Sequence, residues 1–503
     1  MLGTIGTVAG YRSQVRGKPA QVNVLGLLMI QGFAVALMMI MAALYVAFRL
    51  DPSPALGLGP EQLIYPVCWL VIGVFAWSFW SWRRMSGTWF DPYTLFLLSA
   101  VLFNGGQVFL EIFRLNDGGI LAGRFSYDTT IYAVFLVGVG MATLHLGVLI
   151  SAIRKRPRGA EELGGSEGQD GTKDLRWVGL FLLTISIVPM TMIMWRAVVL
   201  VLQGGYFALY QQEAGIGLMA GPQVLASFFV PASLFVLAAN RGSRRWVIAS
   251  GLLILVVSAM AMFMGARYVA VAPLIAYAWV WHRCRRRLSG TVLVGIGAAV
   301  LLVILPLVGS VRNVAGTERS SVAFLVDAYF SLENPSIAAI SEMGGTLKIL
   351  AHTVELVPWV RPFEYGAEYL YAALTVFPNI FWDVHPSVAR GTASDWLIRT
   401  VNPVAAASGG GLGFSFVAEA FLNFGFSGVL IVPFFMGLLY GRFVAWGSWT
   451  SDPAKIATLA SYLSFFLVYA RSDSTSVVRP LIWYTFLPYV LILCLRYYRR
   501  RLA

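Results

Sequence analysis

Long runs of apolar residues, separated by short polar or glycine- and proline-rich stretches, dominate the chain from residue 24 to its end. A run of 18 or more residues with few charges is long enough to cross a bilayer as a helix. The pattern predicts twelve such spans, at 24–48, 62–82, 93–113, 129–152, 177–202, 220–239, 246–264, 267–281, 290–309, 412–440, 456–470 and 478–496. The seventh and eighth are joined by a tight turn, so this stretch is either two spans or one re-entrant or kinked element. The fold class that follows is an all-α, polytopic integral membrane protein.

Composition agrees with that fold class. Hydrophobic residues make up 58% of the 503 positions and charged residues only 12%, whereas a soluble domain carries about 25% charged residues. The first apolar run is longer than the hydrophobic part of a cleaved signal peptide, so we expect it to remain as an anchor. The three cysteines, Cys68, Cys284 and Cys494, lie in or beside apolar segments, which argues against a disulfide framework or a cysteine-based metal site.

The net charge of +13 is distributed in a way that predicts the topology. Basic residues cluster in every second loop and near both ends, at 12–18, 83–84, 154–158, 241–245, 283–287 and 496–501. By the positive-inside rule these segments, and therefore both termini, are cytoplasmic. Because topology accounts for the excess charge, we do not expect nucleic acid as a partner.

The same alternation places 310–411, by far the largest loop, outside the cytoplasm. The loop is too apolar and aromatic to be disordered, and its helical periodicity predicts a mostly helical cap that precedes the last three spans. The chain is thus expected to form an N-terminal bundle of about nine spans (1–309), an extracytoplasmic helical loop (310–411) and a C-terminal bundle of about three spans (412–503).

Four arginines fall at the outer ends of spans, where the positive-inside rule does not explain them: Arg267, Arg312, Arg471 and Arg479. A guanidinium presents five N–H donors in a fixed fork that suits phosphate oxygens. Several together would bind a pyrophosphate without a metal and stabilise its charge as it leaves. Each one taken alone is equally well explained by snorkelling or by a salt bridge to an outer-loop acid, but we do not expect all four to be structural.

A carboxylate, Glu419, lies inside the tenth predicted span. Charged residues at membrane depth cost roughly 2.5–3.5 kcal/mol on insertion scales, so they usually have a partner and a function. The glycine-rich run from Ser408 continues into this span without a break, and steps of four place Ser415, Glu419, Asn423 and Ser427 along one side of the expected helix. Glu419 is either a general base that accepts a proton from an attacking hydroxyl or a counter-ion for one of the arginines.

The outer loop holds further candidates. His352 and His385 are each either a base or an ordinary solvated histidine, and Glu342 is ambiguous in the same way. Tyr365 belongs to an aromatic-rich stretch that is either a platform for sugar rings or part of the aromatic belt at the membrane interface. Arg390, in the same loop, is a candidate substrate ligand.

Known catalytic motifs are missing from the sequence. It contains no Walker loop, no HExxH, no GxSxG and no Cys/His ligand spacing, so we expect no metal site. The first outer loop, 49–61, lacks the paired acids that metal-dependent lipid-linked glycosyltransferases often place there.

The stretch around Glu419 resembles the Wzy-type O-antigen and polysaccharide repeat-unit polymerases. The resemblance rests on Gly413-Phe414-Ser415, then Ala418-Glu419-Ala420-Phe421-Leu422-Asn423-Phe424-Gly425, then Gly428, with Phe421 where tyrosine is common. Shorter similarities occur at Gly265-Ala266-Arg267, Ser341-Glu342-Met343-Gly344, Tyr365-Gly366, Tyr369-Leu370 and Arg471-Ser472-Asp473. Together they cover about residues 260–480.

This resemblance implies a lipid-linked oligosaccharide glycosyltransferase in the bacterial inner membrane, acting in lipopolysaccharide or polysaccharide biosynthesis with its active site facing the periplasm. It implies transfer of a growing glycan from undecaprenyl pyrophosphate to a lipid-linked repeat unit, with no cofactor and no metal. The implied catalytic residues are Glu419, Arg267, Glu342 and His352, and the implied substrate-binding residues are Arg312, Arg471, Arg479, Asn423, Ser415, Tyr365 and Arg390.

Besides the two lipid-linked substrates, membrane lipid is an expected partner. A chain-length regulator protein is a possible further partner. Two other functions also stay open. One is an O-antigen ligase that moves the finished glycan to the lipid A core, and the other is a glycolipid flippase or transporter.

Overall fold

The computed structural model describes residues 23–50, 59–116, 118–155, 169–211, 216–311, 322–331, 333–379 and 382–502. Within these ranges the regular secondary structure is helical throughout, without strands. Eleven helical stretches of this described part are long and apolar enough to cross a membrane. The predicted fold class, an all-α polytopic membrane protein, is therefore confirmed.

The helices fall into three groups along the chain. The first group is α1 (Val24–Leu50), α2 (Pro60–Ser86), α3 (Pro92–Ile112), α4 (Tyr127–Lys155), α5 (Gln169–Gly204), α6 (Ala208–Gln211), α7 (Ile216–Ala226), α8 (Phe229–Ala239), α9 (Arg244–Met264), α10 (Arg267–Cys284), α11 (Gly290–Ala299) and α12 (Leu305–Val311). The outer-loop group is α13 (Val322–Phe330), α14 (Pro335–Met343), α15 (Thr346–Leu356), α16 (Ala367–Leu374), α17 (Pro386–Arg390), α18 (Ala393–Val401) and α19 (Pro403–Ala407). The last group is α20 (Phe416–Ser448), α21 (Pro453–Phe466), α22 (Thr475–Pro480) and α23 (Leu487–Leu502).

Eleven of the twelve predicted spans coincide with these eleven stretches, and the exception is the eighth. Helix α9 ends at Met264 and is followed by Gly265, whose φ of +88° is readily adopted only by glycine, and α10 starts at Arg267. α10 has 18 residues, but Arg267 and Arg283 near its two ends lower its hydropathy, and it is not among the eleven. The stretch forms two separate helices, and α10 packs against α8, α9 and α21.

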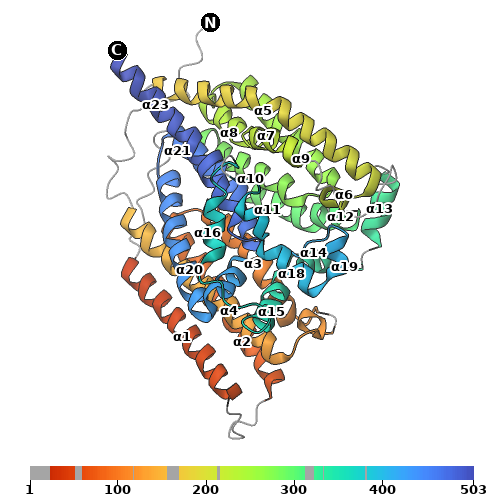
Figure 1. Ribbon diagram of the computed structural model, residues 1–503. Helices are drawn as coiled ribbons and strands as arrows, with labels where there is room; N and C mark the ends of the chain where they lie inside the picture. The colour runs from red at the N-terminus through yellow and green to blue at the C-terminus, as the bar shows by residue number, and fades with distance from the viewer. Residues whose placement is uncertain are drawn as a thin grey trace.

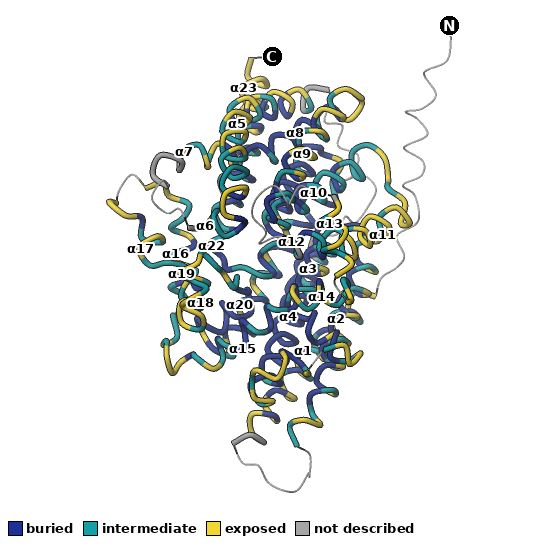
Figure 2. The backbone as a smooth tube through the Cα atoms, turned by 90° about the vertical axis from the view of Figure 1, so that its right-hand side faces the viewer, coloured by how far each residue is buried: buried dark blue, intermediate teal, exposed yellow. Residues whose placement is uncertain are grey.

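Helices α4 and α20 form the centre of the bundle and lie side by side along most of their lengths (Figure 1). Glycines make this close approach possible. A Cβ at Gly437 would overlap the carbonyl of Leu144, and a Cβ at Gly147 would overlap that of Phe434. Small residues at such positions let membrane helices pack backbone to backbone. In Figure 2 the buried residues accordingly concentrate around α3, α4 and α20.

The outer-loop helices are attached to both other groups. α14 packs on α3, α15 packs on α4 and α20, and α16 packs on α22. Trp483, in the last candidate span, donates its indole N–H to the carbonyl of Val376 at 2.7 Å. In Figure 1 helices α14, α18 and α19 lie on the right, at the end of the bundle opposite to the C-terminal end of α23. The helices of residues 322–407 thus pack on spans of both the first and the last group.

Candidate functional site

The glycine-rich run ends where α20 begins, and Ser415 starts that helix. Its hydroxyl oxygen accepts the backbone N–H groups of Val417 (3.1 Å) and Ala418 (3.3 Å), the usual role of a serine N-cap. The same hydroxyl donates to Oδ1 of Asn104 on α3 at 3.1 Å. One residue earlier, the N–H of Phe414 donates to the carbonyl of Arg471 at 3.1 Å. The first turn of α20 is therefore fixed to α3 and to the segment before α22.

Glu419 lies in that first turn and is completely buried. Its carboxylate accepts the N–H of Ser474 at 3.0 Å and the Ser474 hydroxyl at 2.5 Å on Oε1, and the Tyr469 hydroxyl at 3.3 Å on Oε2. Among the described residues no arginine lies within ion-pair distance of it. The partners of the carboxylate in this part of the chain are thus hydroxyl and amide donors rather than a guanidinium.

The helix that carries Glu419 is broken, contrary to the expectation of a continuous span. Gly425 has φ +62° and ψ −144°, a conformation that is essentially restricted to glycine. The break leaves the carbonyls of Leu422 and Asn423 without helical partners, and the outer loop supplies them. The N–H of Glu364 donates to Leu422 at 3.1 Å, and the N–H of Tyr365 donates to Asn423 at 3.0 Å. Irregular backbone at membrane depth needs such partners from the protein.

The break also shortens the predicted polar stripe. Ser415, Glu419 and Asn423 are fully buried on one side of α20, but Ser427, beyond the break, is exposed. Asn423 uses both ends of its amide: Nδ2 donates to the carbonyl of Glu419 at 2.8 Å, and Oδ1 accepts the N–H of Gly366 at 2.9 Å. It therefore joins the Glu419 turn to the outer loop.

Four charged residues hold this part of the outer loop together. Arg361 pairs with Glu364 at 2.6 Å and with Glu368 at 2.9 Å, and Arg390 also contacts both carboxylates. Burial alone would raise the pKa of Glu364, but hydrogen bonds from both arginines outweigh it, so that the pKa lies below its ordinary value. For the more deeply buried Glu368, burial prevails and raises the pKa. The sequence singled out Arg390 but not its three partners.

Tyr369 is a site residue that the sequence analysis missed. Its ring stacks on Phe424 with centroids 6.5 Å apart, and its buried hydroxyl has no hydrogen-bond partner within the described ranges. Burial raises the pKa of Tyr369 well above its ordinary value, and the nearby carboxylates of Glu419 and Glu368 raise it further. An unpartnered O–H donor therefore lies close to both acids. The only sequence signal was Tyr369-Leu370 in the family resemblance.

A second cluster joins two of the predicted residues. Nη1 of Arg267, at the start of α10, lies 2.8 Å from Oε2 of Glu342 on α14. Nε and Nη2 of Arg267 are buried and make no hydrogen bond to any described residue. Gly309 lies against the guanidinium, where a Cβ would overlap it. Arg267 is thus held by one carboxylate while two of its nitrogens keep their N–H groups for another acceptor.

Helix α3 connects the two clusters. Asn104 donates to the carbonyl of Ala470 at 2.9 Å and accepts from Ser415. Three residues further, Gln107 donates to the backbone and side chain of Ser341 at 3.0 and 3.1 Å. Three residues rise about 4.5 Å along a helix, so the Glu419 and Arg267 clusters attach to α3 within one turn. The polar run Asn104-Gly105-Gly106-Gln107, inside a predicted span, is the sequence feature that could have indicated this connection, but it was not singled out above.

The remaining predicted arginines have different positions. Arg479, on α22, has a buried Nε without a hydrogen-bond partner among the described residues. Arg471 places its guanidinium 5.3 Å from the ring centre of Phe103. Arg312 lies outside the described residues, so its predicted place beside the others stays a prediction.

The side chains of the outer-loop candidates His352, His385 and Tyr365 are not among the described hydrogen-bond partners of the Glu419 carboxylate. His352 packs edge-on against Phe125 at 4.7 Å, and burial lowers its pKa to about 4, helped by Lys348 and Arg124. His385 caps α17 by accepting the N–H of Ser387 at 3.2 Å. Tyr365 is 78% exposed. Within the described ranges no group of three or more His, Cys, Asp or Glu side chains is arranged to hold a metal ion.

Comparison with known protein families places the chain. The family model of O-antigen polysaccharide polymerase Wzy matches residues 23–501, nearly the whole chain. No curated protein and no solved structure matches it.

Proposed function

Since the chain belongs to the O-antigen polysaccharide polymerase Wzy family, we propose that it extends a lipid-linked glycan. In this reaction the growing glycan moves from undecaprenyl pyrophosphate to a lipid-linked repeat unit. A hydroxyl oxygen of the acceptor sugar forms a bond to the first anomeric carbon of the donor. The bond from that carbon to the pyrophosphate breaks, and undecaprenyl pyrophosphate leaves with the electron pair. The hydroxyl proton goes to a base on the protein.

Glu419 is the proposed base, and its geometry is the observation that carries the proposal. Three donor groups, the N–H and O–H of Ser474 and the O–H of Tyr469, face its carboxylate. These contacts hold Glu419 in place, and the longest of them, from Tyr469 at 3.3 Å on Oε2, is the one that the acceptor hydroxyl would replace. A positioned base of this kind contributes roughly 10²–10⁴-fold to a rate.

Arg267 and Arg479 are the proposed ligands of the pyrophosphate. Both have buried guanidinium N–H groups that no described residue accepts, and both lie on helices, α10 and α22, that pack against α21. Glu342 holds the Arg267 guanidinium in its orientation. Fixed positive charge at the leaving group stabilises the charge that develops there. No metal takes part in this scheme.

The other candidates receive supporting roles. Ser415 and Asn423 position the turn that carries Glu419, and Arg390 positions the loop that meets the helix break. The exposed ring of Tyr365 offers a face to the sugars of the substrate. We further propose that the protein lies in the inner membrane, with both termini cytoplasmic and this site facing the periplasm.

The proposal is tested by incubating the purified protein with lipid-linked repeat units, with and without EDTA. We expect a ladder of polymer in both reactions. Complete dependence on a divalent ion would overturn the arginine scheme. In cells that lack the gene we expect a single repeat unit on the lipid A core. Free lipid-linked polymer would instead indicate a ligase, and the loss of all surface glycan would indicate a flippase.

A further inference from the structure

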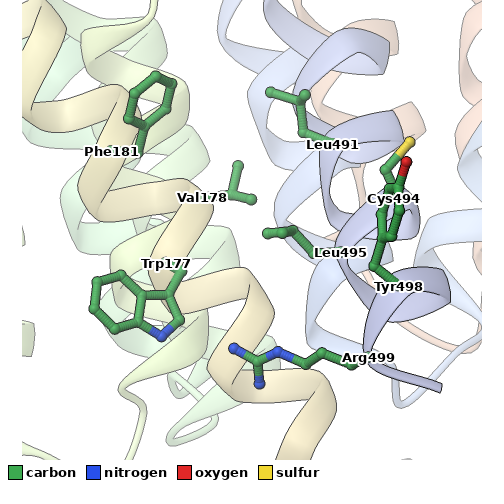
Figure 3. A pocket seen from close by; sticks show the side chains of 8 residues that line it. All are labelled: Trp177, Val178, Phe181, Leu491, Cys494, Leu495, Tyr498 and Arg499. Carbon is green, nitrogen blue, oxygen red and sulfur yellow. The ribbon is translucent and has the colours of Figure 1, made fainter. Parts of the chain in front are cut away.

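A pocket of about 530 Å³ lies far from both clusters, between the first turns of α5 and the last turns of α23 (Figure 3). On one side Trp177, Val178 and Phe181 line it, and on the other side Leu491 and Leu495. Figure 3 shows Val178 and the two leucines pointing toward one another across the gap, with Arg499 reaching toward α5 at one end.

The pocket is a groove that runs along the helices. Leu491, Leu495 and Tyr498 line it from one face of α23, at the helical spacing of four and three residues. The seven steps from Leu491 to Tyr498 correspond to about 10 Å along the helix axis. Because α5 and α23 belong to candidate spans, a groove of this direction runs across the membrane leaflet, as a lipid chain does.

One basic residue, Arg499, lines the groove at the end of α23. The last turn of α23 contains Arg499, Arg500 and Arg501. Nε of Arg499 lies 3.0 Å from Oδ1 of the buried Asp174, and its side chain is 43% exposed. The ion pair with Asp174 thus holds the Arg499 guanidinium at the mouth of the groove. The exposed N–H groups of this guanidinium are available to a phosphate.

The surroundings also resemble a membrane interface. Trp177 and Tyr498, beside the mouth, are 64% and 65% exposed. Tryptophan and tyrosine favour the level of the lipid head groups. The charge pattern of the loops predicts that this end of the bundle is cytoplasmic.

We propose that this groove binds an anionic phospholipid of the cytoplasmic leaflet, with an acyl chain between α5 and α23 and its phosphate on Arg499. Basic pockets between membrane helices on the cytoplasmic side are suited to such head groups. The three arginines in the last turn of α23 favour a lipid with net negative charge over a zwitterionic one. The bound lipid would connect the last span to α5, which belongs to the N-terminal group. This site is independent of the polymerase reaction proposed above.

The test uses the full-length purified protein, stripped of lipid and then mixed with phosphatidylglycerol or phosphatidylcholine, with bound lipid counted by native mass spectrometry. We expect phosphatidylglycerol to bind more tightly and to raise the unfolding temperature. Arg499→Gln should weaken its binding roughly fivefold, the effect of one basic residue at an anionic lipid. Leu495→Trp, which fills the groove, should also weaken it.

Two matched controls distinguish the groove from the general surface. Arg442→Gln removes the same charge from α20, and Leu439→Trp adds the same bulk at an exposed position of that helix. Both should bind phosphatidylglycerol as the wild type does. Arg499→Gln removes the partner of the buried Asp174, so a size-exclusion profile must show that this variant still folds. Leu495→Trp leaves the Arg499–Asp174 ion pair intact and therefore tests the groove without that complication.

Four results would overturn the proposal. The first is equal binding of the two lipids, and the second is an equal effect of Arg442→Gln and Arg499→Gln. The third is unchanged binding in Leu495→Trp, which would mean that another part of the chain fills the groove. Displacement of phosphatidylglycerol by an undecaprenyl phosphate at lower concentration would assign the groove to the polyprenyl chain and would overturn it as well.

Discussion

Ser474 donates both its backbone N–H and its hydroxyl to the carboxylate of Glu419, although 55 positions separate the two residues. The N–H lies 3.0 Å from Oε1 and 3.1 Å from Oε2. Glu419 belongs to the first turn of α20, and Ser474 directly precedes α22. These bonds therefore fix the carboxylate to the same short segment that carries Arg471 and Arg479.

Replacing Glu419 with Gln should abolish most of the polymerase activity. The amide is of similar size and still accepts hydrogen bonds from Ser474, so we expect the protein to fold, but an amide does not accept a proton at neutral pH. The expected loss in rate is about 100-fold or more, the usual contribution of a general base. The measurement is the rate at which the purified variant forms polymer from lipid-linked repeat units.

Two further variants show whether the loss of rate is specific to the carboxylate of Glu419. Ser474→Ala should lower the rate by a smaller factor, because Tyr469 still donates to the carboxylate. Ser427→Ala, on the exposed side of α20 beyond the break, should leave the rate unchanged. Normal long-chain glycan in cells that carry Glu419→Gln would remove this residue from the chemistry.

Gly425 should not tolerate a side chain. Its φ of +62° with ψ −144° is costly for any other residue, and a Cβ would press on the ring of Phe363 at 3.2–3.3 Å. Strain of this kind costs about 1–3 kcal/mol, so Gly425→Ala should lower the unfolding temperature and shorten the surface glycan. Gly411→Ala is the control, because a Cβ there meets nothing within 4 Å. Equal unfolding temperatures for the two variants would contradict the break.

The helices could be read from the sequence because each apolar run alone determines whether a segment crosses the membrane. The eighth predicted span, 267–281, also forms a helix, α10, but the arginines near its two ends keep it outside the eleven candidate spans. Glu419 and Arg267 could also be found, because a charge in or beside an apolar run is costly and therefore conspicuous. The pairing of Arg267 with Glu342 was not foreseen, although both residues were candidates.

The break in α20 could not be predicted, because a single glycine in an apolar run is compatible with an unbroken helix. What decides it is the outer loop, whose Glu364 and Tyr365 bind the freed carbonyls from far away in the chain. The ion pairs of Arg390 with Glu364 and Glu368 could not be predicted for the same reason, because these acids lie 26 and 22 positions before it in the chain. Contacts of this kind depend on how segments pack, which hydropathy does not record.

His352 should make the fold sensitive to acid. Burial, with Lys348 and Arg124 nearby, lowers its pKa from 6.5 to about 4. Between pH 6.5 and 4 the unfolded chain binds a proton that the folded chain does not, so stability should fall as the pH falls through this window. His352→Gln should show a shallower loss of unfolding temperature between pH 7 and pH 4.5. Parallel profiles for the variant and the wild type would contradict this assignment.

Glu342 should act only through Arg267, which a double-mutant cycle can show. Arg267→Gln removes the proposed pyrophosphate ligand and should cause the larger loss, whereas Glu342→Gln leaves the guanidinium in place but without its 2.8 Å partner. The double variant should then be no worse than Arg267→Gln alone, because coupled residues are not additive. The measurement is kcat and KM for the lipid-linked donor, with the exposed Arg399→Gln as the charge control. Additive losses would mean that Glu342 has a separate role, and the orienting ion pair would have to be abandoned.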